Sequence, residues 1–237
     1  MMISKPDKLQ QWLLYTPLGR YVLMNEKIFY HNTIQSIFGY YSIQIGLPQI
    51  NFLQNSKISN HFIIDNNIKC DVVFLPFAEN SIDLIICPHT LEFTPNYHHF
   101  LQECYRVLIP EGKIIITGFN QTSFFNLFKK NIPPLKNGKL IKLNYLKHQL
   151  QNLNFQIIGG KFFSYRPLIN NKKILLNLAW MEKAGDRWFP TFANNYALVA
   201  IKELLTTTRI ETKKNLKNSL IKPQLYPAKL TLYSKKN

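Results

Sequence analysis

The chain has 237 residues, with little cysteine and no long apolar run. Its three cysteines, Cys70, Cys87 and Cys104, are 17 residues apart, which excludes a disulfide framework and a CxxC metal pair. Cys87 lies in an apolar run and is expected to be buried. No apolar window reaches the length of a membrane-spanning helix, and charged residues interrupt the first positions, so neither a spanning helix nor a secretory signal is expected. These absences predict a reduced, soluble, cytoplasmic protein.

Acidic residues are also scarce, at 13 against 29 Lys and Arg, which gives a net charge of +16. Residues 1–119 hold 8 basic and 9 acidic residues, whereas residues 120–237 hold 21 and 4. Such asymmetry is typical of a protein with an anionic partner, either a nucleic acid or a membrane surface. It is equally what an AT-rich genome produces, because Lys, Asn and Ile make up 75 of the 237 residues. Both interpretations stay open at this stage.

Apolar patterning predicts alternating helices and strands, which favours an α/β fold with a mostly parallel sheet. With 46% hydrophobic and 18% charged residues, the chain is not wholly disordered. Residues 82–87 and 113–117 are almost continuously apolar, as in strands buried on both faces, with a turn expected at 110–112. The expected helices are 7–15, 20–38, 96–107, 122–129, 143–153 and 169–184. The expected strands are 41–45, 61–64, 69–74, 82–87, 113–117, 155–158 and 196–201.

A series of short motifs in residues 71–118 resembles the class I S-adenosylmethionine-dependent methyltransferases, most closely those of type 11. In order, the motifs are Asp71, Leu75-Pro76-Phe77, Asn80 to Ile85, His89 to Phe93, Glu103, Arg106-Val107-Leu108 and Pro110 to Lys113. The start, Trp12 with Thr16 to Gly19, and the run Gly118-Phe119-Asn120 also resemble a proteobacterial subgroup of small methyltransferase-like proteins. The resemblance implies a Rossmann-like, doubly wound sheet of seven mostly parallel strands flanked by helices.

The resemblance, together with the loss of apolar periodicity from about residue 206, predicts a domain organisation. A methyltransferase-like domain is expected over residues 1–205, followed by a basic, disordered tail over 206–237. Within the domain, 1–38 would form an N-terminal helical extension, 39–120 the cofactor-binding half and 121–205 the acceptor-side half.

In such sheets the ligand lies beyond the carboxyl ends of the strands. The resemblance implies that Asp71 accepts a hydrogen bond from the adenine of S-adenosylmethionine and that Asp65 binds the ribose hydroxyls. Val72 and Pro88 are assigned to the same crevice. Both aspartates have an alternative interpretation as turn residues.

The first motif of the family, an acidic residue followed by GxGxG, is degenerate here. Gln44 stands at the acidic position, and only Gly46 remains of the three glycines. Pro48 and Ile50 replace the other two, and proline removes an N–H donor where the backbone approaches the cofactor. Gln44 and Gly46 are still predicted to contact the cofactor.

Methyl transfer from a sulfonium is an in-line displacement that depends on positioning and on exclusion of water. His89 follows the fourth strand, so it is the candidate general base, with packing at a strand end as the alternative. Glu92 is a candidate for binding an acceptor amine or for capping the next helix, and Asn120 for hydrogen bonding to the acceptor. No metal-ligand pattern is present, since the adjacent His98 and His99 point in different directions on a helix.

The sequence therefore predicts an S-adenosylmethionine-dependent methyltransferase, with S-adenosylmethionine as cofactor. Its acceptor would be a small molecule, a lipid or quinone precursor, or a nucleic acid. The alternative is a methyltransferase fold that has lost the cofactor and serves as a basic binding module for RNA or another anionic partner, a lipid surface included. The sequence determines neither the acceptor nor the oligomeric state.

Overall fold

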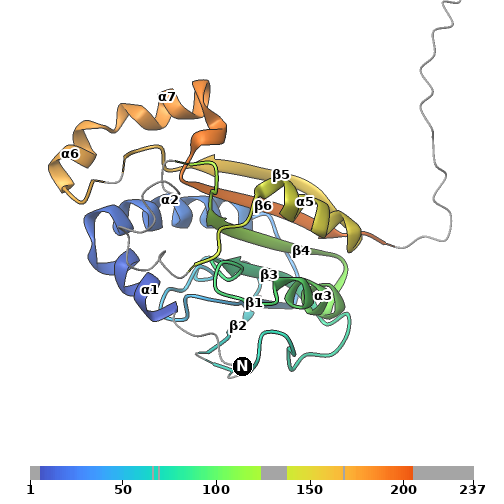
Figure 1. Cartoon of the computed structure of the whole chain (residues 1–237). Coiled ribbons are helices and arrows are strands. Elements are labelled where there is room, and N and C mark those ends of the chain that lie inside the picture. Colours follow the sequence, from blue (N-terminus) through green and yellow to red (C-terminus); the bar gives the residue numbers. More distant parts are fainter. Residues whose placement is uncertain (1–5, 66, 69, 124–137, 168, 205–237) are drawn as a thin grey trace, which may run out of the picture. The chain divides into compact units, whose positions relative to one another are not determined.

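A single mixed sheet of six strands organises the described part of the chain (Figure 1), in the order β2-β1-β3-β4-β6-β5. This computed structural model describes residues 6–65, 67–68, 70–123, 138–167 and 169–204. The strands are β1 (Tyr41–Gln44), β2 (Asn60–Ile63), β3 (Ile82–Pro88), β4 (Leu108–Phe119), β5 (Phe155–Phe163) and β6 (Asn195–Lys202). The first four in spatial order are parallel, and β6 is antiparallel to both of its neighbours. The predicted Rossmann-like α/β fold is confirmed.

The predicted seventh strand, over residues 69–74, is wrong: the described part of this segment forms turns. The side chain of Asp71 accepts a hydrogen bond from the amide of Val73, and its carbonyl accepts one from the amide of Phe74. The amide of Leu75 donates to the carboxylate of Glu103 at 2.9 Å. The amides of Val73, Phe74 and Leu75 therefore donate to Asp71 or Glu103 and do not form a ladder with β2.

The turn predicted at 110–112 is instead an irregularity within β4. The pairing of β3 with β4 shifts between Ile82, opposite Leu108, and Leu84, opposite Lys113. Glu111 has a φ of 64° in this stretch. The extra residues lie on one strand only, as in a β-bulge, so β4 is longer than the predicted strand.

The helices lie on both faces of the sheet. They are α1 (Pro6–Tyr15), α2 (Pro17–Ile34), α3 (Tyr97–Val107), α5 (Leu143–Asn152), α6 (Lys172–Asn177) and α7 (Trp180–Trp188), with a 3-10 helix, η3 (Pro190–Phe192). The predicted helices at 7–15, 20–38, 96–107 and 143–153 are confirmed to within a few residues. Most of the predicted helix at 122–129 and the predicted tail at 206–237 fall outside the described residues. No helix in the described ranges has the length and apolarity needed to cross a bilayer.

The single helix predicted over 169–184 is two helices, α6 and α7. The guanidinium of Arg166 donates to the carbonyl of Leu175 at 2.8 Å. In a continuous helix that carbonyl would accept from the amide of Ala179, which donates instead to the carbonyl of Leu176. This side-chain contact accompanies the break, and the sequence pattern does not reveal it.

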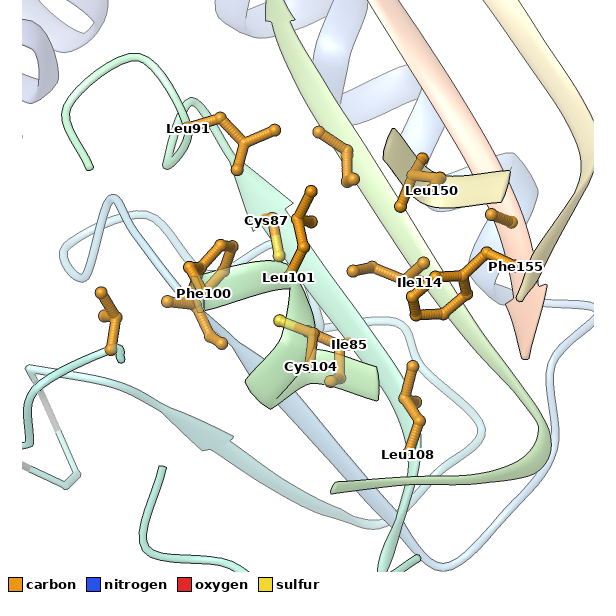
Figure 2. Close-up of a cluster of buried hydrophobic side chains, with 14 of the residues drawn as sticks. Ile85, Cys87, Leu91, Phe100, Leu101, Cys104, Leu108, Ile114, Leu150 and Phe155 are labelled. Atoms are coloured by element: carbon orange, nitrogen blue, oxygen red, sulfur yellow. The ribbon is translucent and has the colours of Figure 1, made fainter. Parts of the chain in front are cut away.

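Alternate residues of the central strands supply two apolar layers. Leu84, Ile86 and Ile115 face the cluster that contains the buried side chains of α1 and α2. Ile85, Cys87, Leu108 and Ile114 face the cluster with α3 and α5, where Phe100, Leu101, Cys104, Leu150 and Phe155 join them (Figure 2). Cys87 is fully buried, as predicted, and all three cysteines are free thiols. The central strands are thus covered on both faces, which leaves their carboxyl ends as the place for a site.

Candidate functional site

The predicted site residues gather at the carboxyl edge of the parallel strands. Gly46 follows β1, Asp65 follows β2, His89 follows β3, and Asn120 follows β4. Because β6 runs antiparallel to β4, its first residue, Asn195, pairs with the last residue of β4 at this same edge. The fold therefore brings residues from distant parts of the sequence to one edge of the sheet.

Gln44 organises the loop that replaces the glycine-rich motif. Its side-chain amide donates to the carbonyls of Gly46, Leu47 and Ile50 at 3.1, 3.2 and 2.6 Å. Its side-chain oxygen accepts a hydrogen bond from the amide of Phe52 at 3.0 Å. A carboxylate has no N–H to offer three carbonyl oxygens, so this loop conformation requires the glutamine that stands at the family's acidic position.

Residues 47–53 direct their apolar side chains into the core. The side chains of Leu47 and Ile50 are 1% and 3% exposed, and they pack with the buried leucines of α1. The amide of Gln49 donates to the side chain of Gln10 in α1, and that of Ile50 donates to the carbonyl of Leu47. These backbone donors are already used within the chain, so they are not available to the methionine part of a cofactor.

The local backbone conformation and the close packing around residue 46 require a glycine there. Its φ is 101°, and a Cβ there would lie 2.6 Å from Thr90 Oγ1 and 2.8 Å from the carbonyl oxygen of Pro88. Thr90 also donates to the carbonyl of Ile45, which fastens the end of β1 to the segment after β3. The surviving glycine thus allows β1 and β3 to approach closely at the edge. Pro88 is buried at the end of β3.

The two aspartates lie near each other beside Cys70. Burial raises the pKa of the Cys70 thiol, and the charges of Asp65 and Asp71 raise it further. Asp65 is exposed at a φ of 70°, and Asp71 is half-buried in its turn. Val72 is 2% exposed and belongs to the core next to α3. The arrangement leaves two carboxylates, but not Val72, at the part of the edge where adenosine is expected.

A clamp on α3 holds the segment after Asp71. The guanidinium of Arg106 donates to the carbonyls of Leu75 and Phe77 at 3.1 and 3.0 Å and to Glu103 at 2.7 Å. Glu103 in turn accepts from the amide of Leu75, and the neighbouring Arg106 lowers the pKa of its carboxyl group. Two residues one helical turn apart therefore fix both sides of the Leu75–Phe77 turn.

His89 is enclosed at the end of β3 between two carboxylates. Its Nε2 atom lies 2.6 Å from Glu26 Oε1, and its Nδ1 atom lies 3.1 Å from Glu92 Oε1. All three residues are buried, and the ring of Phe119 packs against the imidazole with 4.3 Å between centroids. The side-chain amide of Asn195 also donates to Glu26 Oε1, at 3.3 Å. This buried polar cluster joins α2, β4 and β6 to the segment after β3.

The charge state of His89 follows from this geometry. Burial alone would lower the pKa of His89, but the carboxylates of Glu26 and Glu92 outweigh it and raise that pKa to about 10. At neutral pH the ring is an imidazolium whose two N–H groups both face carboxylates. An imidazolium has no free lone pair to accept a proton, so His89 in this state does not fit the predicted role of general base.

Asn120 and Glu92 also have structural partners. The side-chain amide of Asn120 donates to the carbonyls of Thr191 and Ala193, and its oxygen accepts from Thr122. These contacts hold η3 to the end of β4 and differ from the predicted contact with an acceptor. Glu92 accepts from the amide of Phe119 at 2.8 Å. The predicted alternative for Glu92, a helix cap, is wrong because Asn96 caps α3.

Sequence reasoning missed Glu26 and Asn195. A signal for Glu26 was present, because it is an acidic residue in the apolar stripe of α2, four residues from both Val22 and Tyr30. Among the described residues, the cluster retains three buried oxygens that accept no hydrogen bond: Glu26 Oε2, Glu92 Oε2 and Asn195 Oδ1. An additional N–H or O–H donor would satisfy this unused capacity. No group of three or more metal-binding side chains within the described part of the chain is placed to hold a metal ion.

Comparison with known proteins agrees with the motifs. Residues 39–116 match the family model of a methyltransferase domain, Methyltransf_11. The chain is 34% identical over 115 residues to the uncharacterized protein YafS of Escherichia coli, covering 46% of this chain and 48% of that protein. It is 35% identical over 95 residues to a demethylmenaquinone methyltransferase of Oceanobacillus iheyensis, covering 37% and 39%. The chain thus spans less than half the length of these relatives.

Solved structures give the fold. One is a complex between the Haloferax volcanii Trm112 methyltransferase activator and a methyltransferase, with a TM-score of 0.59 at 12% identity over 85% of this chain and all of that one. Another is a SAM-dependent methyltransferase from Archaeoglobus fulgidus, with a TM-score of 0.57 at 19% identity over 77% of this chain and 94% of that one. The motifs and the match over residues 39–116 agree that this part of the chain is similar to a type 11 methyltransferase domain, and the sheet has the fold of class I methyltransferases.

Proposed function

We propose that the protein transfers a methyl group from S-adenosylmethionine to an acceptor held at the carboxyl edge of β3 and β4. The observation that carries the proposal is the placement of Gly46, Asp65 and Asp71 at one edge of a sheet whose residues 39–116 match a methyltransferase domain. When bound, S-adenosylmethionine supplies a methyl group on a sulfonium. Asp65 and Asp71 would accept hydrogen bonds from its adenosine part.

The residues present fit the adenosine part better than the methionine part. Carboxylates are suitable acceptors for ribose hydroxyls and for the adenine amino group, and both aspartates are at least partly accessible. At the other end the amides of Gln49 and Ile50 are used within the chain. Binding of the methionine part would therefore depend on contacts other than these two amides.

The buried polar cluster would position the acceptor. The imidazolium of His89 holds Glu26 and Glu92 in fixed places, and each carboxylate keeps one oxygen without a hydrogen bond from described residues. We propose that these oxygens accept hydrogen bonds from an N–H or O–H group of the acceptor. The apolar surroundings, with Phe119 against His89, exclude water and strengthen such contacts.

Calorimetric titration of the full chain with S-adenosylmethionine tests this proposal. We expect saturable binding that Asp71→Asn weakens by about tenfold, because that change removes the negative charge from the group that accepts a hydrogen bond from the adenine. Asp186→Asn, a change at an exposed acid on α7, is the matched control and should bind as the unaltered chain does. Absence of heat with folded protein at about 1 mM cofactor, where even weak binding is measurable, would contradict the proposal.

A second candidate function is a methyltransferase fold that does not use the cofactor and binds an anionic partner. The loop at residues 47–53 favours it, because its apolar side chains are buried and the amides of Gln49, Ile50 and Phe52 already donate within the chain. Under this alternative, S-adenosylmethionine would not bind, and affinity for RNA would fall steeply with salt concentration. The titration above and a filter-binding assay at two salt concentrations separate the two functions.

A further inference from the structure

The helices α6 and α7 and the 3-10 helix η3 expose an unusual number of large apolar side chains. We call this set the aromatic surface, and its members are Ile174, Leu176, Trp180, Trp188, Phe189 and Phe192. Trp180 and Trp188 are 64% and 70% exposed. A cluster of exposed apolar side chains indicates an interaction surface for a protein or a membrane, whereas single exposed apolar residues do not.

The orientation of α7 is fixed by contacts on its opposite side. The carboxylate of Glu182 accepts from the amide of Tyr165, and it lies 3.8 Å from the guanidinium of Arg166. Gly185 faces the ring of Tyr165 so closely that a Cβ would lie 2.3 Å from it. With this side held against the domain, Trp180 and Trp188 are directed to solvent.

An open apolar hollow of about 480 Å³ lies between the aromatic surface and Tyr165. Its lining includes Tyr165, Met181 and the four aromatic members of this surface. The hollow presents mainly aromatic and aliphatic side chains, so it suits hydrocarbon rather than a polar ligand.

Basic residues border this surface. Lys172 and Lys173 begin α6, and Lys183 and Arg187 are one turn apart on α7, with all four side chains exposed. The helix α7 carries two acidic residues. Glu182 faces the domain, as its contacts with Tyr165 and Arg166 show, and only Asp186 is exposed. The border is therefore predominantly cationic and complements an anionic surface.

We propose that the aromatic surface docks on an anionic lipid bilayer, with Trp180, Trp188 and Phe189 inserted at the headgroup level. Short helices with Trp and Phe beside Lys and Arg are suited to the bilayer interface, where apolar burial and attraction to anionic lipid act together. Docking places the carboxyl edge of the sheet near the membrane, because η3 is separated by only two residues from Asn195 of the buried polar cluster. This inference concerns binding alone and does not depend on cofactor use.

Tryptophan quenching tests the docking directly, since the chain has three tryptophans and residues 205–237 contain none. In a Trp12→Phe background the emission comes only from Trp180 and Trp188. We expect vesicles of phosphatidylglycerol and phosphatidylcholine with brominated acyl chains to quench it and shift it to the blue. Vesicles of pure phosphatidylcholine should do so much less at equal lipid concentration.

Paired variants separate this surface from other basic segments. Trp180→Ser with Trp188→Ser should weaken co-sedimentation of the otherwise unaltered chain with the anionic vesicles by about tenfold or more. Tyr15→Ser with Phe38→Ser is the matched control, because these side chains are 73% and 70% exposed elsewhere, and it should bind as the unaltered chain does. Thermal unfolding confirms that both variants are folded.

Three outcomes would overturn the proposal. Absence of quenching by brominated anionic vesicles would show that α7 does not enter the bilayer. Undiminished co-sedimentation of the folded double tryptophan variant would assign membrane binding to another segment, including residues 124–137 or 205–237. Equal quenching by neutral vesicles would remove the role of the basic border.

Discussion

At the scale of single residues, the conformation of the loop after β1 depends on a glutamine, Gln44, at a position where the family has an acidic residue. Gln44 both donates and accepts hydrogen bonds within the loop after β1, and a carboxylate in its place only accepts. The degenerate first motif is therefore an alternative loop with its own polar centre. Loss of the second and third glycines is accompanied by apolar residues that pack into the core.

Gln44→Glu is expected to destabilise the protein by about 2–4 kcal/mol, because it places a buried carboxylate against three carbonyl oxygens. Urea unfolding measures the change. Gln54→Glu, at an exposed position of the same loop, is the control and should alter the free energy of unfolding by less than about 0.5 kcal/mol. Equal effects of the two substitutions would refute this account of Gln44.

His89 predicts a pH dependence of stability. Its pKa in the folded protein is about 10, above the ordinary value of 6.5. A raised pKa stabilises the folded state fully below pH 6.5, and this contribution is lost as the pH rises through 10. The difference in free energy of unfolding between the unaltered chain and His89→Gln should therefore shrink between pH 7 and pH 10. A difference that stays constant over this range would contradict the imidazolium assignment.

At the scale of elements, α3 does more than cover the sheet. Its buried residues Phe100, Leu101, Cys104 and Val107 form an apolar stripe on one side of the helix. Its polar side carries the clamp of Glu103 and Arg106, which replaces strand hydrogen bonding for the segment after Asp71. One helix thus supplies both core packing and the fixation of a loop beside the predicted cofactor site.

Arg106→Ala is expected to cost about 1–2 kcal/mol and to speed hydrogen exchange at the amide of Leu75, because the carbonyls on both sides of the turn lose their donor. Arg106→Lys should recover only part of this, since an ammonium does not reproduce the guanidinium fork. Gln102→Ala, exposed on the same helix, is the control. Unchanged exchange at Leu75 in Arg106→Ala would show that the clamp is not needed.

At the scale of the whole molecule, the N-terminal helices are joined to the sheet by a buried charge. Glu26 of α2 contacts His89 beyond β3 and Asn195 of β6, more than 160 residues away in the sequence. Apolar packing of α1 and α2 surrounds this contact. The helices α1 and α2 therefore contribute to the candidate site and cover one face of the sheet at the same time.

Glu26→Ala should lower the free energy of unfolding by about 3–5 kcal/mol, because it leaves the buried imidazolium with one carboxylate fewer. Amides of α2 should exchange faster than those of β3 and β4, which remain in the sheet. Lys27→Ala, the exposed neighbour in the same helix, is the control and should have little effect. A similar small effect for both variants would indicate that apolar packing alone holds the helices.

The basic excess also has a place in the molecule. In the described part of residues 120–204, Lys202 is buried and donates to the carbonyls of Tyr105 and Leu108, and Arg166 stacks on Tyr21 and holds α6. Lys172, Lys173, Lys183 and Arg187 border the aromatic surface. An AT-rich genome would account for the abundance of such residues, but not for their position around exposed tryptophans.

The sequence by itself determined the fold class, most helices and strands, and the methyltransferase motifs, because periodicity and short motifs are local properties of the chain. The turns at 70–75 and the break between α6 and α7 needed the tertiary structure, since Glu103 and Arg166 act there from distant positions. The same holds for His89. Its residue type permits a general base, but the approach of Glu26 and Glu92 makes it a buried cation, and pKa values follow from neighbours that only folding assembles.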